Sequence, residues 1–258
     1  MQDLRFSIIQ TNLVWESPKE NLESFRSLLL PLKSKTDVIV LPEMFTTGFS
    51  MNPKELFDSS EGTTLKWMMQ QAAYLDAAII ASAIIKDKDK FYNRLFFVCP
   101  DGSYHTYDKK HLFTLAGEHE CYTPGQQRLV VNYKGWRICP FICYDLRFPA
   151  WARYKGDYDV LVYVANWPER RISAWDILLK ARAIENMSYC VGVNRIGTDG
   201  NQYPYIGHSA IYDALGNLKS TSDFEKELVD TQVLSYQELI SIRERLGFLN
   251  DRDEFELR

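Results

Sequence analysis

The segment that most constrains the fold of this chain is residues 135–149, which read GWRICPFICYDLRFP. Its apolar run, residues 138–142, ends at Cys143, and polar and charged residues follow directly. A short continuous apolar run is typical of a strand that is buried on both faces. Open α/β sheets bind ligands at the carboxyl ends of such strands, so Cys143 is a candidate functional residue. Most free cysteines are instead small buried hydrophobic residues, so the other strand ends must decide between the two interpretations.

Strands and helices alternate early in the sequence, hairpins follow, and the alternation then returns. This order predicts an α/β fold with mixed sheets and helices outside them, and we expect one domain over residues 1–258. Strands are expected over residues 4–10, 37–41, 77–85, 91–98, 102–107, 129–133, 136–142, 159–165, 188–194, 206–212, 218–220 and 228–233. Helices are expected over residues 18–32 (capped by Ser17), 63–74 (capped by Thr63 or Thr64), 149–155, 173–186 and 235–246. Residues 114–125 lack a clear period and predict a loop long enough to line a pocket.

Two further charged residues follow predicted strands. Glu43 comes directly after an apolar strand and Pro42, whose ring fixes φ, so we expect its carboxylate to be held rigidly. A surface loop position is an equally good interpretation of Glu43 taken alone. Lys109 follows the strand at 102–107, although two adjacent lysines most often form a solvated turn. His111 could act as a base, but its apolar neighbours favour a packed structural role.

Together, the three strand ends suggest a chemistry. A thiol, a carboxylate and an ammonium form a workable set for acyl transfer. A cysteine of ordinary pKa is only about 3% thiolate at pH 7, so an adjacent base or cation would raise its reactive fraction. We expect Glu43 to take the proton of Cys143, and Lys109 to stabilise the oxyanion together with the backbone N–H of Tyr144. A His-assisted cysteine protease is disfavoured, because no histidine follows a comparable strand.

The composition argues against several classes of protein. The net charge is −4 and no basic stripe occurs, so we expect no nucleic-acid partner. The apolar runs are too short to cross a membrane, and the first residues do not resemble a signal peptide. The five cysteines are odd in number and scattered, which fits a reducing cytoplasmic location without a disulfide framework.

Motifs for metal and nucleotide binding are also missing from the sequence. No CxxC pair occurs, and the second histidine of an HExxH helix is absent, so we expect no metal site. Neither a GxGxxG fingerprint nor a P-loop is present, which argues against a nucleotide-binding protein.

Three segments resemble the motifs of the nitrilase superfamily of carbon–nitrogen hydrolases: LPEMFTTGFSM around Glu43, YDKKHLF around Lys109 and ICYDLRFP around Cys143. The resemblance covers essentially the whole chain. It implies a four-layer α-β-β-α sandwich, commonly a homodimer, with a Glu–Lys–Cys triad and no cofactor. It selects Lys109 over Lys110, and it maps a second glutamate, thought to orient the lysine and the substrate, onto Glu118.

Within the superfamily, the motifs look most like the bacterial omega-amidase branch. That resemblance implies hydrolysis of the terminal amide of a small-molecule substrate, 2-oxoglutaramate or 2-oxosuccinamate. Such acids need a cationic clamp, because guanidinium binds carboxylate in bidentate fashion. Arg171 is the first choice, since it follows the strand end at residues 166–168, and Trp167 is a candidate wall of the pocket. Arg147, Arg170 and Arg195 are further candidates, and for each arginine a surface or interface ion pair is the alternative.

Other functions remain open at this point. Within the superfamily, the alternatives are a nitrilase, an N-carbamoyl amino-acid hydrolase or another amidase. A non-catalytic binding module on the same fold is a further alternative, although the presence of Glu43, Lys109, Glu118 and Cys143 argues against it.

Overall fold

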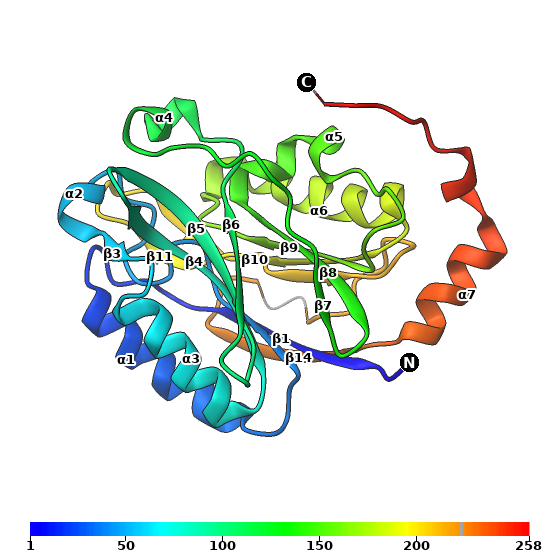
Figure 1. Cartoon of the computed structure of the whole chain (residues 1–258), viewed down its shortest axis with the longest axis horizontal. Helices are drawn as coiled ribbons and strands as arrows, with labels where there is room; N and C mark the ends of the chain where they lie inside the picture. Colours follow the sequence, from blue (N-terminus) through cyan, green and yellow to red (C-terminus); the bar gives the residue numbers. More distant parts are fainter. Residues whose placement is uncertain (222–223, 258) are drawn as a thin grey trace.

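The computed structural model describes residues 1–221 and 224–257, and it shows two β-sheets packed face to face (Figure 1). Helices cover the outer face of each sheet, so the chain forms the expected four layers in the order α-β-β-α. Helices α1 (Pro18–Leu29) and α3 (Thr63–Leu75) cover the first sheet. Helices α5 (Pro149–Ala152) and α6 (Ile172–Asn186) cover the second sheet. The short α2 (Pro53–Leu56) and α4 (Glu118–Cys121) lie in loops, and α7 (Tyr236–Leu246) follows the last strand.

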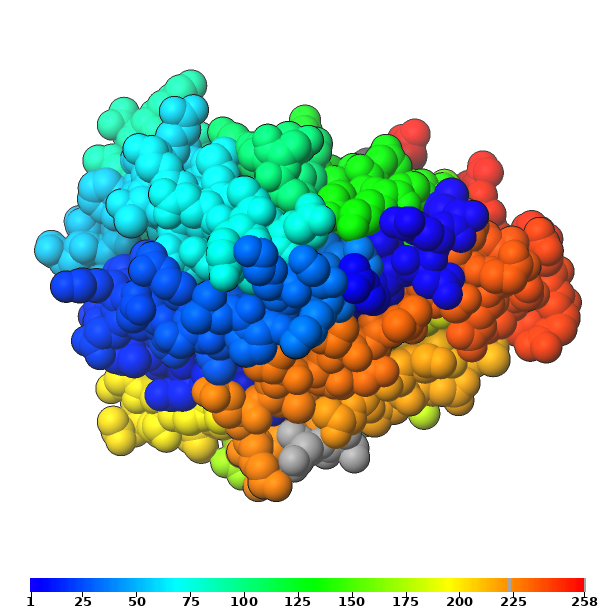
Figure 2. Space-filling view, turned by 90° about the horizontal axis from the view of Figure 1, so that it is seen from below, coloured from blue at the N-terminus to red at the C-terminus, as the bar shows by residue number. Residues whose placement is uncertain are grey.

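The first sheet has the strand order β14-β1-β2-β4-β5-β6, with β3 paired to β4. Strand β1 runs parallel to β2 and antiparallel to β14, so a strand from the first part of the chain pairs with one from its last part. Figure 2 shows the blue N-terminal residues beside the orange segment from below. The strands are β1 (Leu4–Gln10), β2 (Val38–Val40), β3 (Asp58–Ser59), β4 (Ala78–Asp87), β5 (Lys90–Val98), β6 (Tyr104–Asp108) and β14 (Leu228–Leu234).

The second sheet has the order β13-β10-β9-β8-β7, in which β8, β9 and β10 run parallel. A small separate ladder, formed by β11 and β12, follows the end of β10. The strands are β7 (Val131–Tyr133), β8 (Trp136–Ile142), β9 (Val160–Val164), β10 (Tyr189–Val193), β11 (Ile196–Thr198), β12 (Pro204–Ile206) and β13 (Ala210–Tyr212).

The strands read as continuous apolar runs because both of their faces are buried. Successive side chains of a strand point to opposite faces. In β4, Ala78 and Ile80 pack in the core between the two sheets, whereas Ile79 and Ala81 pack beneath α1 and α3. Burial of apolar side chains at about 25 cal/mol per Å² on both faces makes the central strands the most strongly held part of the fold.

The strand directions bring distant residues to one edge. Strand β2 runs parallel to β4, and two antiparallel pairings, β4 with β5 and β5 with β6, return β6 to that same direction. The carboxyl ends of β2 and β6 therefore lie at the same edge of the first sheet. Strands β8 and β9 likewise end together in the second sheet.

Five local expectations are wrong in detail. The strand expected over residues 206–212 is interrupted, because Gly207 and His208 both adopt positive φ between β12 and β13. The segment 218–220 contributes only an isolated bridge at Leu218. The cap position of α3 is Gly62, and Asp58 rather than a threonine accepts the N–H of Thr64.

At α1, Ser17 occupies the cap position, but its hydroxyl donates to Glu20 instead of capping a backbone N–H. The expected helix at 149–155 ends at Ala152. Among the described residues, no helix has the length and apolar character needed to cross a membrane.

Candidate active site

Cys143 lies at a sharp turn between β8 and the 3₁₀ turn Cys143–Arg147. Its φ is +45°, a left-handed conformation that is uncommon for a residue other than glycine. Asp145 holds the turn: its Oδ2 accepts the N–H of Ile142 at 3.1 Å and the hydroxyl of Tyr107 at 2.7 Å. The turn carries Cys143 out of the sheet, so that it lines a cavity.

His111 belongs to the support of this turn. Its ring Nδ1 lies 2.7 Å from Oδ1 of Asp145, and its ring stacks on Phe148 with the centroids 3.6 Å apart. This packing agrees with the structural role that the sequence favoured.

Glu43 is wholly buried, which excludes the surface-loop interpretation. It follows β2, and the next residue, Met44, has a φ of +43°. The turn is held from β4, where Ser82 accepts the N–H of Met44 at 2.9 Å. Oε2 of Glu43 accepts the backbone N–H of Asn166 at 2.9 Å, which ties the end of β2 to the end of β9 across the two sheets.

Lys109 lies between two carboxylates. Its Nζ is 2.8 Å from Oε1 of Glu43 and 3.0 Å from Oε1 of Glu118. All three side chains have no exposed surface, so the solvated turn does not describe Lys109. Glu118 comes from α4, inside the segment expected as a loop, and its Oε2 also accepts the N–H of Phe113 at 2.6 Å.

The electrostatics of these groups are set by burial and by their mutual charges. Burial alone would lower the pKa of Lys109, but the charges of Glu118 and Glu43 outweigh it, so the pKa is raised and the ammonium persists. Burial raises the pKa of the Glu118 carboxyl, and the charge of Lys109 offsets only part of that effect. One cation therefore faces two acids whose side chains have no exposed surface.

The same surroundings act on the thiol. Burial raises the pKa of Cys143 well above its ordinary value, and the negative charge of Glu43 acts in the same direction. The charge of Lys109 opposes these effects but does not overcome them. Neither an adjacent base nor a cation maintains a standing thiolate, so activation requires transfer of the thiol proton to a base at the moment of attack.

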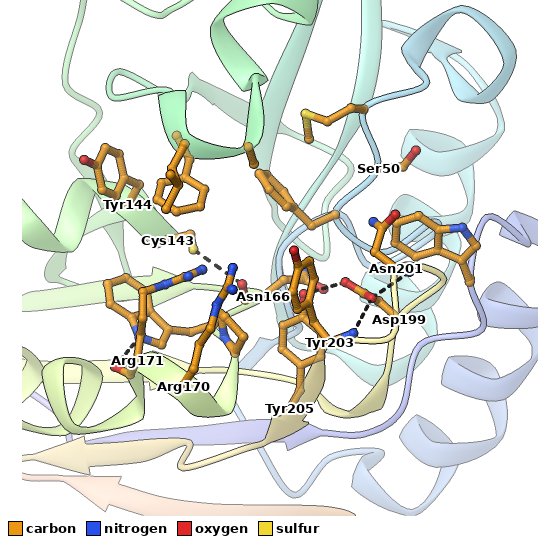
Figure 3. A pocket seen from close by; sticks show the side chains of 18 of the residues that line it. Ser50, Cys143, Tyr144, Asn166, Arg170, Arg171, Asp199, Asn201, Tyr203 and Tyr205 are labelled. Carbon is orange, nitrogen blue, oxygen red and sulfur yellow. Dashed lines mark hydrogen bonds between the residues drawn. The ribbon is translucent and has the colours of Figure 1, made fainter.

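The cavity beside Cys143 has a volume of about 460 Å³ (Figure 3). Such a volume lies within the ordinary range for small-molecule sites. Lys109 and Cys143 line it, whereas Glu43 and Glu118 lie behind its wall. The other lining residues come mainly from the loops after β1, β2, β6, β8, β9 and β11 and include Trp15, Glu16, Phe49, Phe113, Tyr144, Asn166, Trp167, Asp199, Tyr203 and Tyr205.

Three of the four candidate arginines line this cavity: Arg147, Arg170 and Arg171. Figure 3 shows the guanidinium groups of Arg170 and Arg171 in the same space as the Cys143 sulfur. Arg171 rests on the ring of Phe113, 4.9 Å from its centroid, and burial followed by the charge of Arg170 lowers its pKa. Within the described part of the chain, none of the three forms an ion pair of 4.0 Å or less with a carboxylate.

Arg195 lies elsewhere. It is wholly buried beneath Tyr205, and its Nη2 donates to the carbonyl of Leu13 at 3.1 Å and to Oδ1 of Asn12 at 2.9 Å. It ties the loop after β1 to β11 and does not line the cavity.

The wall of the cavity is organised by hydrogen bonds from two loops. Trp167 donates its indole N–H to the carbonyl of Arg171 at 2.8 Å, and Arg147 lies 5.1 Å from its ring centroid. Asp199 accepts the N–H of Tyr203 at 3.0 Å and the hydroxyl of Tyr205 at 2.9 Å, which fixes the loop between β11 and β12.

The sequence reasoning missed the roles of two asparagines. Asn93, in the middle of β5, donates to both Glu43 and Glu118. Asn166, directly after β9, donates its N–H to Glu43, and its carbonyl lies 3.9 Å from the Cys143 sulfur. Asn166 ends an apolar run just as Cys143 does, and that signal could have found it. Asn93 shows no such signal, because its role depends on the register of β5.

Within residues 1–221 and 224–257, no cluster of three or more histidine, cysteine, aspartate or glutamate side chains could hold a metal ion. Each of the five cysteines is a free thiol.

Comparisons of this chain with a family model, with other sequences and with solved structures all indicate the same family. The family model of the carbon–nitrogen hydrolases matches residues 5–241. A Yersinia enterocolitica protein described as omega-amidase YafV is 44% identical over 99% of both chains. The 2-oxoglutaramate amidase of Bacillus subtilis is 30% identical over 95% of this chain and 96% of its own. The crystal structure of XC1258 from Xanthomonas campestris, a CN-hydrolase superfamily protein with an arsenic adduct in its active site, covers 100% of both chains at 42% identity, with a TM-score of 0.97.

Proposed function

We propose, from the premise that this chain belongs to the carbon–nitrogen hydrolase family, that it hydrolyses the terminal amide of a 2-oxo dicarboxylic acid monoamide. The chain is a hydrolase of C–N bonds. The observation that carries the choice of substrate is one cavity that combines the Cys143 thiol with Arg147, Arg170 and Arg171. Relatives described as omega-amidase and 2-oxoglutaramate amidase support the same choice.

The cavity suits a molecule with an anionic end and an amide end. Among the described residues, the three guanidinium groups have aromatic neighbours and no ion-paired carboxylate, so a substrate carboxylate would supply the missing counter-charge. Arg171 is our first choice for this contact, since it is half-buried and Arg170 adds positive charge beside it. The neutral amide then lies beside Cys143 and Lys109, where a charged end would face Glu43 and Glu118 behind the wall.

The chemistry follows from the positions of the three groups. The sulfur of Cys143 attacks the amide carbon while Glu43 takes the thiol proton. The oxyanion receives hydrogen bonds from Nζ of Lys109 and from the N–H of Tyr144, whose place in the first turn after Cys143 leaves that N–H without a partner in the turn. Glu43 then gives the proton to the nitrogen, the C–N bond breaks, and ammonia leaves a thioester on Cys143.

Water completes the reaction. Glu43, again ionised, accepts a proton from a water molecule that attacks the thioester carbon, and the C–S bond breaks to release the acid and restore the thiol. Glu118 stays bonded to Lys109 throughout and holds the ammonium in place. The cycle needs no cofactor.

The experiment that tests this function is ammonia release from 2-oxoglutaramate, compared with glutamine and a simple nitrile. The expected result is a much higher kcat/KM for 2-oxoglutaramate, because glutamine places an ammonium among the three arginines and a simple nitrile offers them no carboxylate. Faster turnover of a nitrile would overturn the proposed substrate and favour a nitrilase.

We also propose a cytoplasmic homodimer. The five free thiols fit a reducing compartment. The outer face of α6 exposes Ile177 and Ile184, at 67% and 46% of their full surface, and Leu215 lies in the turn packed against Ile184. Apolar residues grouped on one face are typical of a surface that a partner covers. Light scattering should give twice the chain mass for the native protein and less for I177E, whereas a monomeric native protein would contradict the dimer.

A further inference from the structure

The carboxylate pair of the site has a second bridging group besides the lysine. Asn93 is wholly buried in β5, and its Nδ2 lies 2.8 Å from Oε1 of Glu43 and 3.2 Å from Oε1 of Glu118. Nζ of Lys109 donates to the same two oxygens. The two carboxylate oxygens and the two nitrogens therefore alternate around a closed ring of four hydrogen bonds.

The backbone of Asn93 also contributes to the site. Its carbonyl accepts the N–H of Lys109 at 3.0 Å, just beyond the end of β6. One residue of β5 thus holds the main chain of the cation and the side chains of both acids.

From this geometry we infer that Asn93 is a positioning residue that keeps Glu43 and Glu118 ionised side by side and aims Glu43 at the thiol. The inference rests on the proposed function, in which Glu43 must be a free base before each attack. Asn93 does not line the cavity, so it does not touch the substrate.

The orientation of the amide supports this role. Oδ1 of Asn93 is buried and has no hydrogen-bond partner in the described part of the chain. Turning the amide over would satisfy nothing and would place that oxygen against two carboxylates. The site therefore uses Asn93 as a donor only, and it leaves an acceptor unpaired to do so.

The charges around the pair explain why a second donor is needed. Two acids share the charge of Lys109, and like charges in a buried site favour uptake of a proton. A neutral donor stabilises the ionised pair without altering the net charge that the substrate meets. The titratable groups that face the pair from other elements are Lys109 after β6, Tyr122 after α4 and Cys143 after β8.

Loss of the donor should change the pH dependence of the reaction. Removal of Nδ2 takes more stabilisation from the ionised pair than from the protonated pair, so the pair becomes protonated at a higher pH. We expect the acid limb of kcat/KM to move up by about one pH unit, the size expected for a hydrogen bond to a charged group. The limb reports the pair as a whole, since its members titrate together. KM should change little, whereas kcat should fall by about tenfold or more.

The test uses N93L, which keeps the branched shape but has no donor, and N93A, a smaller side chain without a donor that fits the same space if leucine disturbs folding. The matched control is N186L, since Asn186 is equally buried but bonds to the backbone of Tyr154 and Arg182, away from the pair. A shifted acid limb in the Asn93 variants but not in N186L supports the inference.

The opposite result is equally clear. If both Asn93 variants keep the wild-type acid limb and lose only activity or stability, the residue is merely structural and the inference fails. The profiles are recorded with the best amide of the panel, so a wild-type enzyme that prefers another amide removes only the proposed substrate. A wild-type enzyme inactive on every amide would overturn both.

Discussion

Replacing Lys109 by methionine should expose how strongly the site depends on a single cation. Methionine retains the length of the apolar stem but removes the ammonium, and Glu43 and Glu118 then face each other in a site without exposed surface. Removal of one partner of a buried ion pair costs about 3–5 kcal/mol, because an uncompensated charge stays buried. We therefore expect K109M to lose about that much of its free energy of unfolding at neutral pH, together with its activity.

The loss should depend on pH with a definite sign. The pKa of Glu118 is already raised in the folded chain by burial, and the charge of Lys109 is the main opposing effect. A raised folded pKa contributes stability that is present below the unfolded pKa and is lost as pH rises through the folded pKa. Without Lys109 the folded pKa rises further, so the stability of K109M should fall by about 1.4 kcal/mol per pH unit over a wider range above about pH 4.5.

Urea unfolding at several pH values between about 5 and 8 measures this slope. The double variant K109M/E118Q should be more stable than K109M near pH 8, because one of the two unpaired carboxylate charges is gone. K110M is the matched control, since the neighbouring Lys110 lies at the surface and bonds to Gln126. Parallel stability curves for K109M and the wild type would refute the argument, as would an equally steep curve for K110M.

Two further predictions concern catalysis and binding. C143A should release no ammonia but should unfold like the wild type, and ready turnover by C143A would show that Cys143 is not the nucleophile. E43Q should lose activity by about 10³-fold or more, because glutamine cannot accept the thiol proton. Near-normal kinetics of E43Q would show that Glu43 is not the base. R171L should raise KM for 2-oxoglutaramate by about 10- to 100-fold with a smaller effect on kcat, because the substrate loses a hydrogen bond to a charged group. An unchanged KM would mean that Arg147 or Arg170 binds the carboxylate instead.

The layers and most strands could be predicted from the sequence because burial on both faces leaves an unbroken apolar run. The apolar runs at residues 138–142 and 37–41 were predicted as strands for this reason, and Cys143 and Glu43 follow them. The directions of the strands are the second reason that the site could be predicted. The hairpin between β5 and β6 brings Lys109 back to the edge of the sheet where β2 ends. Strand ends are thus informative in a fold of this class even when the residues that follow them, Glu43, Lys109 and Cys143, are 34 to 100 positions apart.

Other features had no local signal. Arg171 and Arg195 both follow strand ends, yet one lines the cavity and the other is buried beneath Tyr205, since only the packing of the loops separates them. The interruption at Gly207 and His208 depends on two left-handed residues, of which only the glycine is a usual choice. Asn93 is a polar residue inside a strand, and its meaning appears only when the register sets it against the two acids.

The precision of the site comes from turns whose conformation the rest of the fold imposes. Met44 and Cys143 adopt positive φ, and each lies at or next to a side chain of the proposed chemistry. Such backbone persists only where the surroundings over-determine it. Here Ser82 of β4 binds the N–H of Met44, and Asp145 binds the N–H of Ile142, so each strained turn is held by a neighbour anchored in the packed strands or in their turns. The rigid sandwich is thus what allows an acid from one sheet and a thiol from the other to meet at a fixed separation.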